Sequence, residues 1–338
     1  MRRRRPLALA CAALAAFAAC GGGREGRGGA SSPNARAAPA SAEVVPALRP
    51  DRAAFPAPRG RTLRQLAATV AAGPQLALAT SVHEPGRARV AFGLIAPDNR
   101  FLYAPTAIYV ARGPDAPARG PFLAPADSLE VRPAFRSRTS NAVEGELKAV
   151  YRARVPLPRP GRWLLLAVSA QDGRLVGATA PLAVRDQPRI PDVGDPAPRV
   201  ATPTAADVGG DLAAIDTREP PSDMHRASLA DVLGRRPVAL LFATPALCRS
   251  RVCGPVADIG AQLQAAYGDR VEFIHVEVYV DNDVAKGLRP QLAAYGLTTE
   301  PWLFAIDADG RVAARLEGAF GVGEYRAAVE RALAGAGR

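Results

Sequence analysis

Residues Pro237–Pro255 read PVALLFATPALCRSRVCGP. The run from Val238 to Ala243 has the length and the continuous apolar character of a buried strand, and prolines bound it. Two cysteines follow, Cys248 and Cys253, and after them the apolar residues recur with the period of a helix. The stretch therefore predicts a strand, a cysteine loop and a helix, in that order.

The start of the predicted helix decides what the two sulfurs can do. Residues five apart in a regular helix have Cα atoms about 9 Å apart, whereas a disulfide tolerates only about 7 Å. A bridge therefore requires that the helix begin after Cys248. Pro255 suits the first helical position, which places Cys253 just before the first turn. The N–H groups and the dipole of a helix start also favour a thiolate over a thiol.

Two segments resemble parts of the thioredoxin superfamily. Cys253-Gly254-Pro255-Val256 resembles the family's Cys-Gly-Pro-Cys box with Val256 in place of the last cysteine, and Cys248 supplies a second sulfur upstream. Residues 296–307, GLTTEPWLFAID, are similar to the segment that carries the family's cis-proline, followed by a strand. The resemblance implies a thioredoxin-like α/β domain over residues 222–338, with Cys248, Cys253 and cis-Pro301 at its site.

The N-terminus resembles a bacterial lipoprotein signal. Residues 2–5 are arginines, and residues 6–19 form an apolar stretch too short to span a bilayer as an anchor. Cys20 follows Phe17-Ala18-Ala19, where Phe17 replaces the usual aliphatic residue, and precedes three glycines. The resemblance implies a signal over residues 1–20, lipidation of Cys20 and a location on the outer face of a bacterial membrane. Simple secretion to the periplasm or beyond is the alternative.

Export determines how the four cysteines are used. If Cys11 is removed with the signal and Cys20 is lipidated, Cys248 and Cys253 remain as thiols. Two nearby cysteines in an oxidising compartment pair or cycle. We therefore expect a disulfide, or a readily formed one, between Cys248 and Cys253.

The length of 338 residues suggests two domains with additional ends. Residues 21–60 are rich in Gly, Ala, Pro and Arg without an apolar period, which predicts a disordered tether. Residues 61–186 carry short strand patterns divided by turns, which predicts an all-β sandwich of immunoglobulin-like type. The expected strands are 75–82, 88–95, 101–110, 148–155, 163–169 and 175–184. Residues 113–143 are expected as a loop, and residues 187–221 as a linker.

The formal charge of +11 raises the question of a nucleic-acid partner. Because Lys148 and Lys286 are the only lysines, nearly all of the positive charge comes from arginine. These arginines are scattered singly along the chain. No basic run with interleaved aromatic residues follows the N-terminus, and binding by counterion release needs clustered charge. We expect no nucleic-acid partner.

The first activity that fits two cysteines in this loop is thiol–disulfide exchange, in which one thiolate attacks a substrate disulfide and the other sulfur resolves the intermediate. Arg249 and Arg251 would help to keep the sulfur ionised, whereas Glu300 beside Pro301 would oppose ionisation. Cys253 matches the family box and Cys248 matches the usual distance after the strand. The attacking sulfur is therefore left open.

Two other activities are weaker candidates. Thr244-Pro245 before Cys248 is similar to a class of peroxiredoxins, yet Pro301 stands where those enzymes carry an activating arginine. A Sco-like copper chaperone would use a histidine later in the chain, and none follows His275. The three histidines, His83, His225 and His275, are isolated in the sequence, and each is expected to be an ordinary residue rather than a ligand. We therefore expect no metal site and no cofactor.

The main prediction is an exported, membrane-tethered thioredoxin-like protein that exchanges thiols and disulfides with envelope proteins through Cys248 and Cys253. Its direction of exchange and its oligomeric state are left open. The alternative is a non-catalytic envelope lipoprotein, in which the bridge is structural and the β-domain binds a partner.

Overall fold

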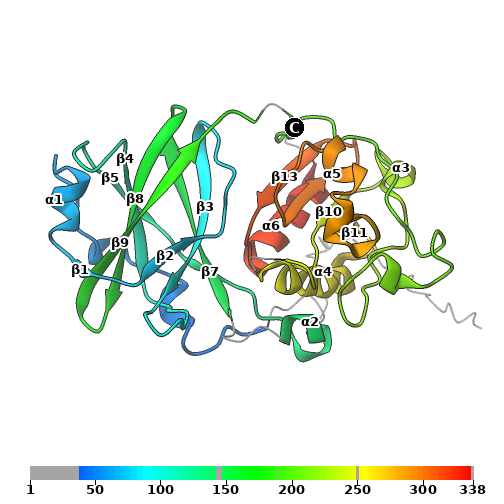
Figure 1. The fold of residues 1–338 in the computed structure, drawn as a ribbon, viewed down its shortest axis with the longest axis horizontal. Coiled ribbons are helices and arrows are strands. Elements are labelled where there is room, and N and C mark those ends of the chain that lie inside the picture. The colour runs from blue at the N-terminus through cyan, green and yellow to red at the C-terminus, as the bar shows by residue number, and fades with distance from the viewer. Residues whose placement is uncertain (1–37, 142–146, 188, 249–250, 336–338) are drawn as a thin grey trace, which may run out of the picture. The chain divides into compact units, whose positions relative to one another are not determined.

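The computed structural model describes residues 38–141, 147–187, 189–248 and 251–335 of the chain. Figure 1 shows two regions in this part, one made of β-sheets and one in which helices flank a sheet. The strands are β1 (Ala71–Ala72), β2 (Gln75–Leu78), β3 (Gly86–Ile95), β4 (Thr106–Ala111), β5 (Arg119–Leu123), β6 (Ala126–Ser128), β7 (Ala149–Leu157), β8 (Gly161–Gln171), β9 (Arg174–Val184), β10 (Val238–Phe242), β11 (Glu272–Val276), β12 (Trp302–Ile306) and β13 (Val312–Glu317). The helices are α1 (Leu63–Ala67), α2 (Arg138–Asn141), α3 (Leu229–Val232), α4 (Cys253–Tyr267), α5 (Pro290–Ala294) and α6 (Val322–Ala334).

The first region is a sandwich of two sheets. One sheet has the strand order β1-β9-β8-β4-β5, and the other has the order β2-β3-β7-β6. Alternate residues of β3 and β7, such as Phe92 and Tyr151, share an apolar core with residues of β4 and β8, such as Ile108 and Leu165. Each of the six strands expected from alternation overlaps a strand of the structure, two of them shortened (β2 and β4) and four of them lengthened (β3, β7, β8 and β9). The immunoglobulin-like type of this sandwich stays a prediction.

Two expectations for the sandwich were wrong. The described residues before position 60 are not a tether, because the side chains of Val44 and Ala47 are fully buried in the sandwich core. The stretch 113–143 is not simply a loop, because β5 and β6 extend the two sheets by pairing with β4 and β7. The sequence from Arg61 to Ala72 forms the short helix α1 and then β1, which pairs with β9.

The second region is an α/β unit around the sheet β11-β10-β12-β13. β10 pairs parallel to β11 and antiparallel to β12, and β12 pairs antiparallel to β13. All five residues of β10 are buried, as its apolar run predicts for a central strand. Alternate residues of β10 face opposite sides, so that Leu241 packs with α4 and α6 and Leu240 packs with α3 and α5. A central mixed sheet with helices packed on both faces is the α/β arrangement that the thioredoxin-like prediction requires.

The expected linker, residues 187–221, belongs largely to the α/β unit. Ile190 and Ala197 are buried in the core on the α5 side of the sheet. The backbone of Asp195 accepts a hydrogen bond from Val312, and Ala197 donates one to Gly310, so this segment runs along the start of β13. The segment expected as a linker therefore packs along the edge of the sheet through its few apolar residues.

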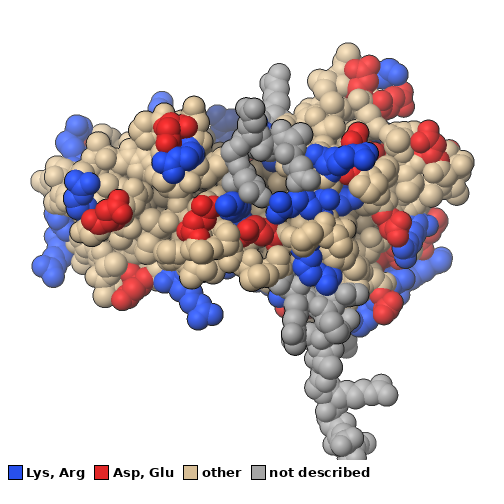
Figure 2. All heavy atoms as spheres, turned by 90° about the horizontal axis from the view of Figure 1, so that it is seen from below, with Lys and Arg blue, Asp and Glu red and all other residues tan. Residues whose placement is uncertain are grey.

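Positively and negatively charged side chains are intermixed on the surface. Figure 2 shows Lys and Arg groups spread over the face in view, with Asp and Glu groups beside many of them. Exposed ion pairs such as Arg64–Asp115 and Arg226–Asp223 illustrate the pattern. Among the residues that the structure describes, no helix combines the length and the apolar character that crossing a membrane requires. The signal region and Cys20 lie outside the described residues.

Candidate functional site

The two cysteines come together at the start of α4. Cys248 lies in the loop after β10 and is partly exposed, whereas Cys253 is the first residue of α4 and has 0% exposure. Both are free thiols, and their side chains are hydrogen-bonded to each other. The helix begins after Cys248. This is the condition that the spacing of the two cysteines sets for a disulfide between them. Pro255 is the third helical residue rather than the first, because α4 already begins at Cys253.

Burial raises the pKa of the Cys253 thiol well above its usual value. The hydrogen bond and charge of Cys248 add to the rise, and a backbone hydrogen bond with Thr244 opposes it. Glu300 acts on Cys253 in the direction expected from the sequence, because its negative charge also raises the pKa. The two sulfurs therefore have different environments, one sheltered and protonated and one open to solvent.

The peptide bond between Glu300 and Pro301 is cis, as expected from the sequence. Pro301 precedes β12 directly, and its carbonyl accepts a hydrogen bond from the backbone of Gly318 at the end of β13. The Trp302 indole donates to Thr299 on the other side of the bond. Arg249 lies outside the described residues, and Arg251 has the left-handed backbone conformation, with φ of 60°, just before the helix.

A hollow of about 600 Å³ opens beside Cys248. Its walls come from the cysteine loop, from the start of α4, from residues 217–219 and from α2 of the sandwich. Arg138 and Glu219 form an exposed ion pair of 3.2 Å on its wall. The hollow thus has charged side chains in its wall.

The sandwich reaches this site through the segment from Pro133 to Asn141. The backbone N–H of Ser137 donates to Asp258 of α4 at 3.0 Å. Arg218 forms an ion pair of 2.8 Å with the same carboxylate, and also donates to the carbonyl of Phe135. Arg218 and Asp258 are both buried, so the pair fixes α4, the sandwich segment and residues 216–222 against one another.

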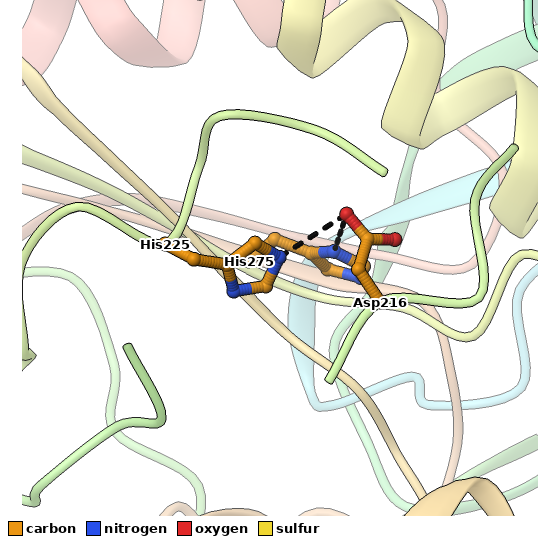
Figure 3. A group of neighbouring side chains, drawn as sticks. All are labelled: Asp216, His225 and His275. Carbon is orange, nitrogen blue, oxygen red and sulfur yellow. Dashed lines mark hydrogen bonds and ion pairs between the residues drawn. The ribbon is translucent and has the colours of Figure 1, made fainter. Parts of the chain in front are cut away.

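A second group of polar side chains lies below the cysteine loop. Asp216, His225 and His275 are buried, and one possible ligand atom of each lies within 4.8 Å of the others. Figure 3 shows both imidazole rings directed at one carboxylate oxygen. His225 Nε2 lies 3.1 Å and His275 Nδ1 lies 3.4 Å from Asp216 Oδ2. The expectation that the histidines are isolated was wrong for these two, because the fold brings a loop residue and a residue of β11 to the same carboxylate.

The charges in this cluster stabilise each other. Burial alone would lower the pKa of His275, but the Asp216 carboxylate outweighs burial and raises it to about 9. Burial would raise the pKa of Asp216, but the two imidazoles hold it well below its usual range. His83 lies apart from this cluster and contacts Thr80.

Residues 216–222 are the part of the site that sequence reasoning missed. Thr217 links the cysteine loop to β11, because its hydroxyl accepts from the Ala246 N–H and donates to Glu277. His275 belongs to β11 and Glu277 directly follows its last residue, so the two lie two positions apart and project to the same side. That alternation of polar residues in an otherwise apolar strand was the one available signal.

No protein-family model matches the chain, and no curated protein matches it. Among solved structures, a putative thiol:disulfide interchange protein DsbE from Chlorobium tepidum is 21% identical, with a TM-score of 0.30 over 44% of this chain and 99% of that chain. A thioredoxin family thiol:disulfide interchange protein from Chlorobium tepidum TLS is 19% identical, with a TM-score of 0.29 over 42% of this chain and 98% of that chain.

Proposed function

We propose that this protein is a thiol–disulfide oxidoreductase in which Cys248 attacks and Cys253 resolves. The observation that carries the proposal is the unequal pair of hydrogen-bonded thiols, with Cys248 partly exposed beside a hollow and Cys253 fully buried. An attacking thiol needs access and a reachable thiolate form. A resolving thiol needs neither until the mixed disulfide has formed next to it.

The reaction proceeds in two exchanges. The Cys248 thiolate attacks one sulfur of a substrate disulfide, so that a mixed disulfide forms and the substrate's other sulfur leaves as a thiolate. Cys253 then attacks the Cys248 sulfur, its proton passes to a released thiolate, and the second substrate sulfur leaves. The substrate gains two electrons, and Cys248 and Cys253 become joined in the bridge that the sequence predicts. The reverse sequence of steps oxidises a dithiol.

Neighbouring residues support an attacking role for Cys248 and a resolving role for Cys253. Burial keeps Cys253 protonated before the mixed disulfide forms, and the charge of Glu300, next to cis-Pro301, acts in the same direction. The hollow beside Cys248 offers room for a substrate segment, and Arg138 and Thr139 of the sandwich form part of its wall. We therefore propose that the sandwich restricts which envelope thiols or disulfides reach Cys248.

We further propose that the protein acts outside the cell membrane as a lipoprotein anchored through Cys20. The arginine-rich start, the apolar stretch and the Gly run after Cys20 support this location. Cys20→Ser should move the protein from the membrane fraction to the soluble fraction of the envelope, and mass spectrometry of the native N-terminal peptide should show a lipidated cysteine.

The test is the reduction potential of the Cys248/Cys253 pair together with turnover of a model protein disulfide. A potential above about −300 mV with turnover supports an exchanger, whereas a lower potential without turnover indicates a structural bridge. Cys253→Ser should accumulate a mixed disulfide at Cys248, and Cys248→Ser should form none. Cys20→Ser is the matched control, because it removes a cysteine outside the site and should leave turnover unchanged. Trapping at Cys253 instead would overturn the proposed order of attack.

A further inference from the structure

The cluster of Asp216, His225 and His275 lies outside the thiol chemistry proposed above. Its three side chains are at most 2% exposed, and they come from residues 216–225 and from β11. Two imidazoles and a carboxylate are a ligand set that zinc and similar divalent cations favour. The question is whether this arrangement requires a cation.

The hydrogen bonding of His275 answers that question. Its Nε2 lies 3.0 Å from the carbonyl oxygen of Ala243, which can only accept, so Nε2 carries a hydrogen. Its Nδ1 makes no hydrogen bond among the described residues and faces Asp216 Oδ2 at 3.4 Å. In a neutral ring this places a lone pair against a carboxylate oxygen in a buried site, which is repulsive. A cation, either a proton or a metal ion, belongs at Nδ1.

The surroundings match the outer shell of a metal site. A metal-bound histidine characteristically donates its other N–H to a carbonyl or carboxylate, as His275 does to Ala243. The Asp216 carboxylate is held on both oxygens, by the backbone N–H of Arg218 at 2.9 Å and by that of Ser222 at 2.8 Å. These bonds fix the carboxylate where both rings can reach it.

The distances also suit a small divalent ion. Ligand atoms about 2.0–2.2 Å from a tetrahedral zinc lie roughly 3.3–3.5 Å from one another. The two oxygen–nitrogen edges of the cluster measure 3.1 and 3.4 Å, and the third edge is at most 4.8 Å. If the ligand nitrogens of His225 and His275 move closer together, all three distances between ligand atoms match those around a zinc ion.

Glu277 supplies counter-charge. Its side chain is buried, its Oε2 has no hydrogen-bond partner among the described residues, and its charge acts on His275. The Arg289 guanidinium, whose charge also interacts with Glu277, offsets part of this negative charge, and a cation at Nδ1 of His275 offsets the rest. Buried charge of this kind is stable only when it is compensated.

We infer that Asp216, His225 and His275 form a binding site for a divalent cation of the zinc type. Because the ligands are buried, the ion enters as the chain folds, and it joins β11 to the loop that carries Asp216. Ala243 precedes Thr244, whose backbone contacts the Cys253 thiol, so the site lies directly beneath the cysteine loop. The inference does not depend on the proposed thiol chemistry.

The test measures zinc in the full chain refolded with chelator or with one equivalent of zinc. The background replaces all four cysteines, Cys11, Cys20, Cys248 and Cys253, by serine, so that thiolates bind none of the metal. We expect one zinc per chain by elemental analysis, and a melting temperature about 5 °C or more above that of the chelator-refolded form. His225→Ala should lose the zinc, and the matched control His83→Gln, another buried histidine, should keep it.

Two results would overturn the inference. If the background protein refolded with one equivalent of zinc contains none and melts at the same temperature as the chelator-refolded form, the cation at His275 is a proton, which nuclear magnetic resonance would show as a doubly protonated ring. If His225→Ala keeps one zinc, the metal lies elsewhere. Should His225→Ala fail to fold, X-ray absorption of the cobalt form decides, because nitrogen and oxygen ligands with two imidazoles support the site and any other set of ligands contradicts it.

Discussion

The Asp127 carboxylate accepts a hydrogen bond of 2.8 Å from the backbone N–H of Glu324 in the first turn of α6. Its other oxygen accepts from the N–H of Gly323 at 2.9 Å. Asp127 belongs to β6 of the sandwich, 197 positions away in the sequence, and α6 has no side-chain cap of its own. Because the first N–H groups of a helix need acceptors, the sandwich completes the closing helix of the α/β unit.

Asp127→Ala should therefore lower the free energy of unfolding by about 1–2 kcal/mol, the usual loss for a helix cap. Asp127→Asn should lose less, because one carbonyl oxygen remains to accept a bond. Urea denaturation followed by circular dichroism measures both. Asp51→Ala is the matched control, because Asp51 caps a short exposed turn through Ala53. Equal losses at Asp127 and Asp51 would contradict a role for Asp127 in joining the two regions.

Gly254 should be intolerant of a side chain because of the sandwich. A Cβ at Gly254 would lie 2.9 Å from the hydroxyl oxygen of Ser140 in α2. Gly254→Ala should cost roughly 1–3 kcal/mol of stability, and adding Ser140→Ala should recover most of the loss. A double-mutant cycle in urea measures the coupling. Gly113→Ala serves as control, because nothing lies within 4 Å of a Cβ there. A coupling near zero would mean that α2 does not cover α4.

These contacts mark the limit of what the sequence could predict. Strands such as β8 and β9 were found because alternation and turn residues are local signals. The α/β unit was found because β10, the cysteines and Pro301 occur in an order that few folds share. β5 and β6 were missed because they are short and are stabilised by pairing with β4 and β7 rather than by their own composition.

The candidate site divides in the same way. The spacing from Cys248 to Cys253 required only that the helix begin after Cys248 if the two form a bridge, and the unequal burial of the two sulfurs depends on tertiary packing. Asp216 and His275 lie 59 positions apart by their numbers, and no local pattern connects them. Only the pairing of β11 with β10 brings His275 under the loop that follows β10.

The two thiols should react at different rates. Because burial raises the pKa of Cys253, iodoacetamide at neutral pH should label Cys248 first, with Cys253 slower by on the order of tenfold or more. Peptide mapping by mass spectrometry over time measures both rates, and the urea-unfolded chain, in which both sulfurs are exposed, is the control. Glu300→Gln should speed labelling of Cys253, because it removes a negative charge that raises the pKa. Faster labelling of Cys253 than of Cys248 would contradict the proposed roles.

His83 should make the protein sensitive to mild acid. Its side chain is buried with Nε2 3.0 Å from the Thr80 hydroxyl. Burial lowers the pKa of His83 to about 4, and the Arg89 charge acts in the same direction. As the pH falls from 6.5, the ordinary value, towards 4, the unfolded chain binds a proton that the native protein does not. The free energy of unfolding therefore falls across this window, by about 3 kcal/mol for this group, and the loss levels off below it.

The measurement is urea denaturation at a series of pH values from neutral to acid for the native chain and for His83→Gln. Glutamine has no charge to gain, so the variant should lose less stability than the native chain over the same window. The difference between the two curves isolates His83 from the carboxyl groups, which titrate in both proteins. Two parallel curves would mean that the native protein admits a proton at His83 as easily as the unfolded chain does, and hence that Thr80 and its neighbours do not shield the ring from water.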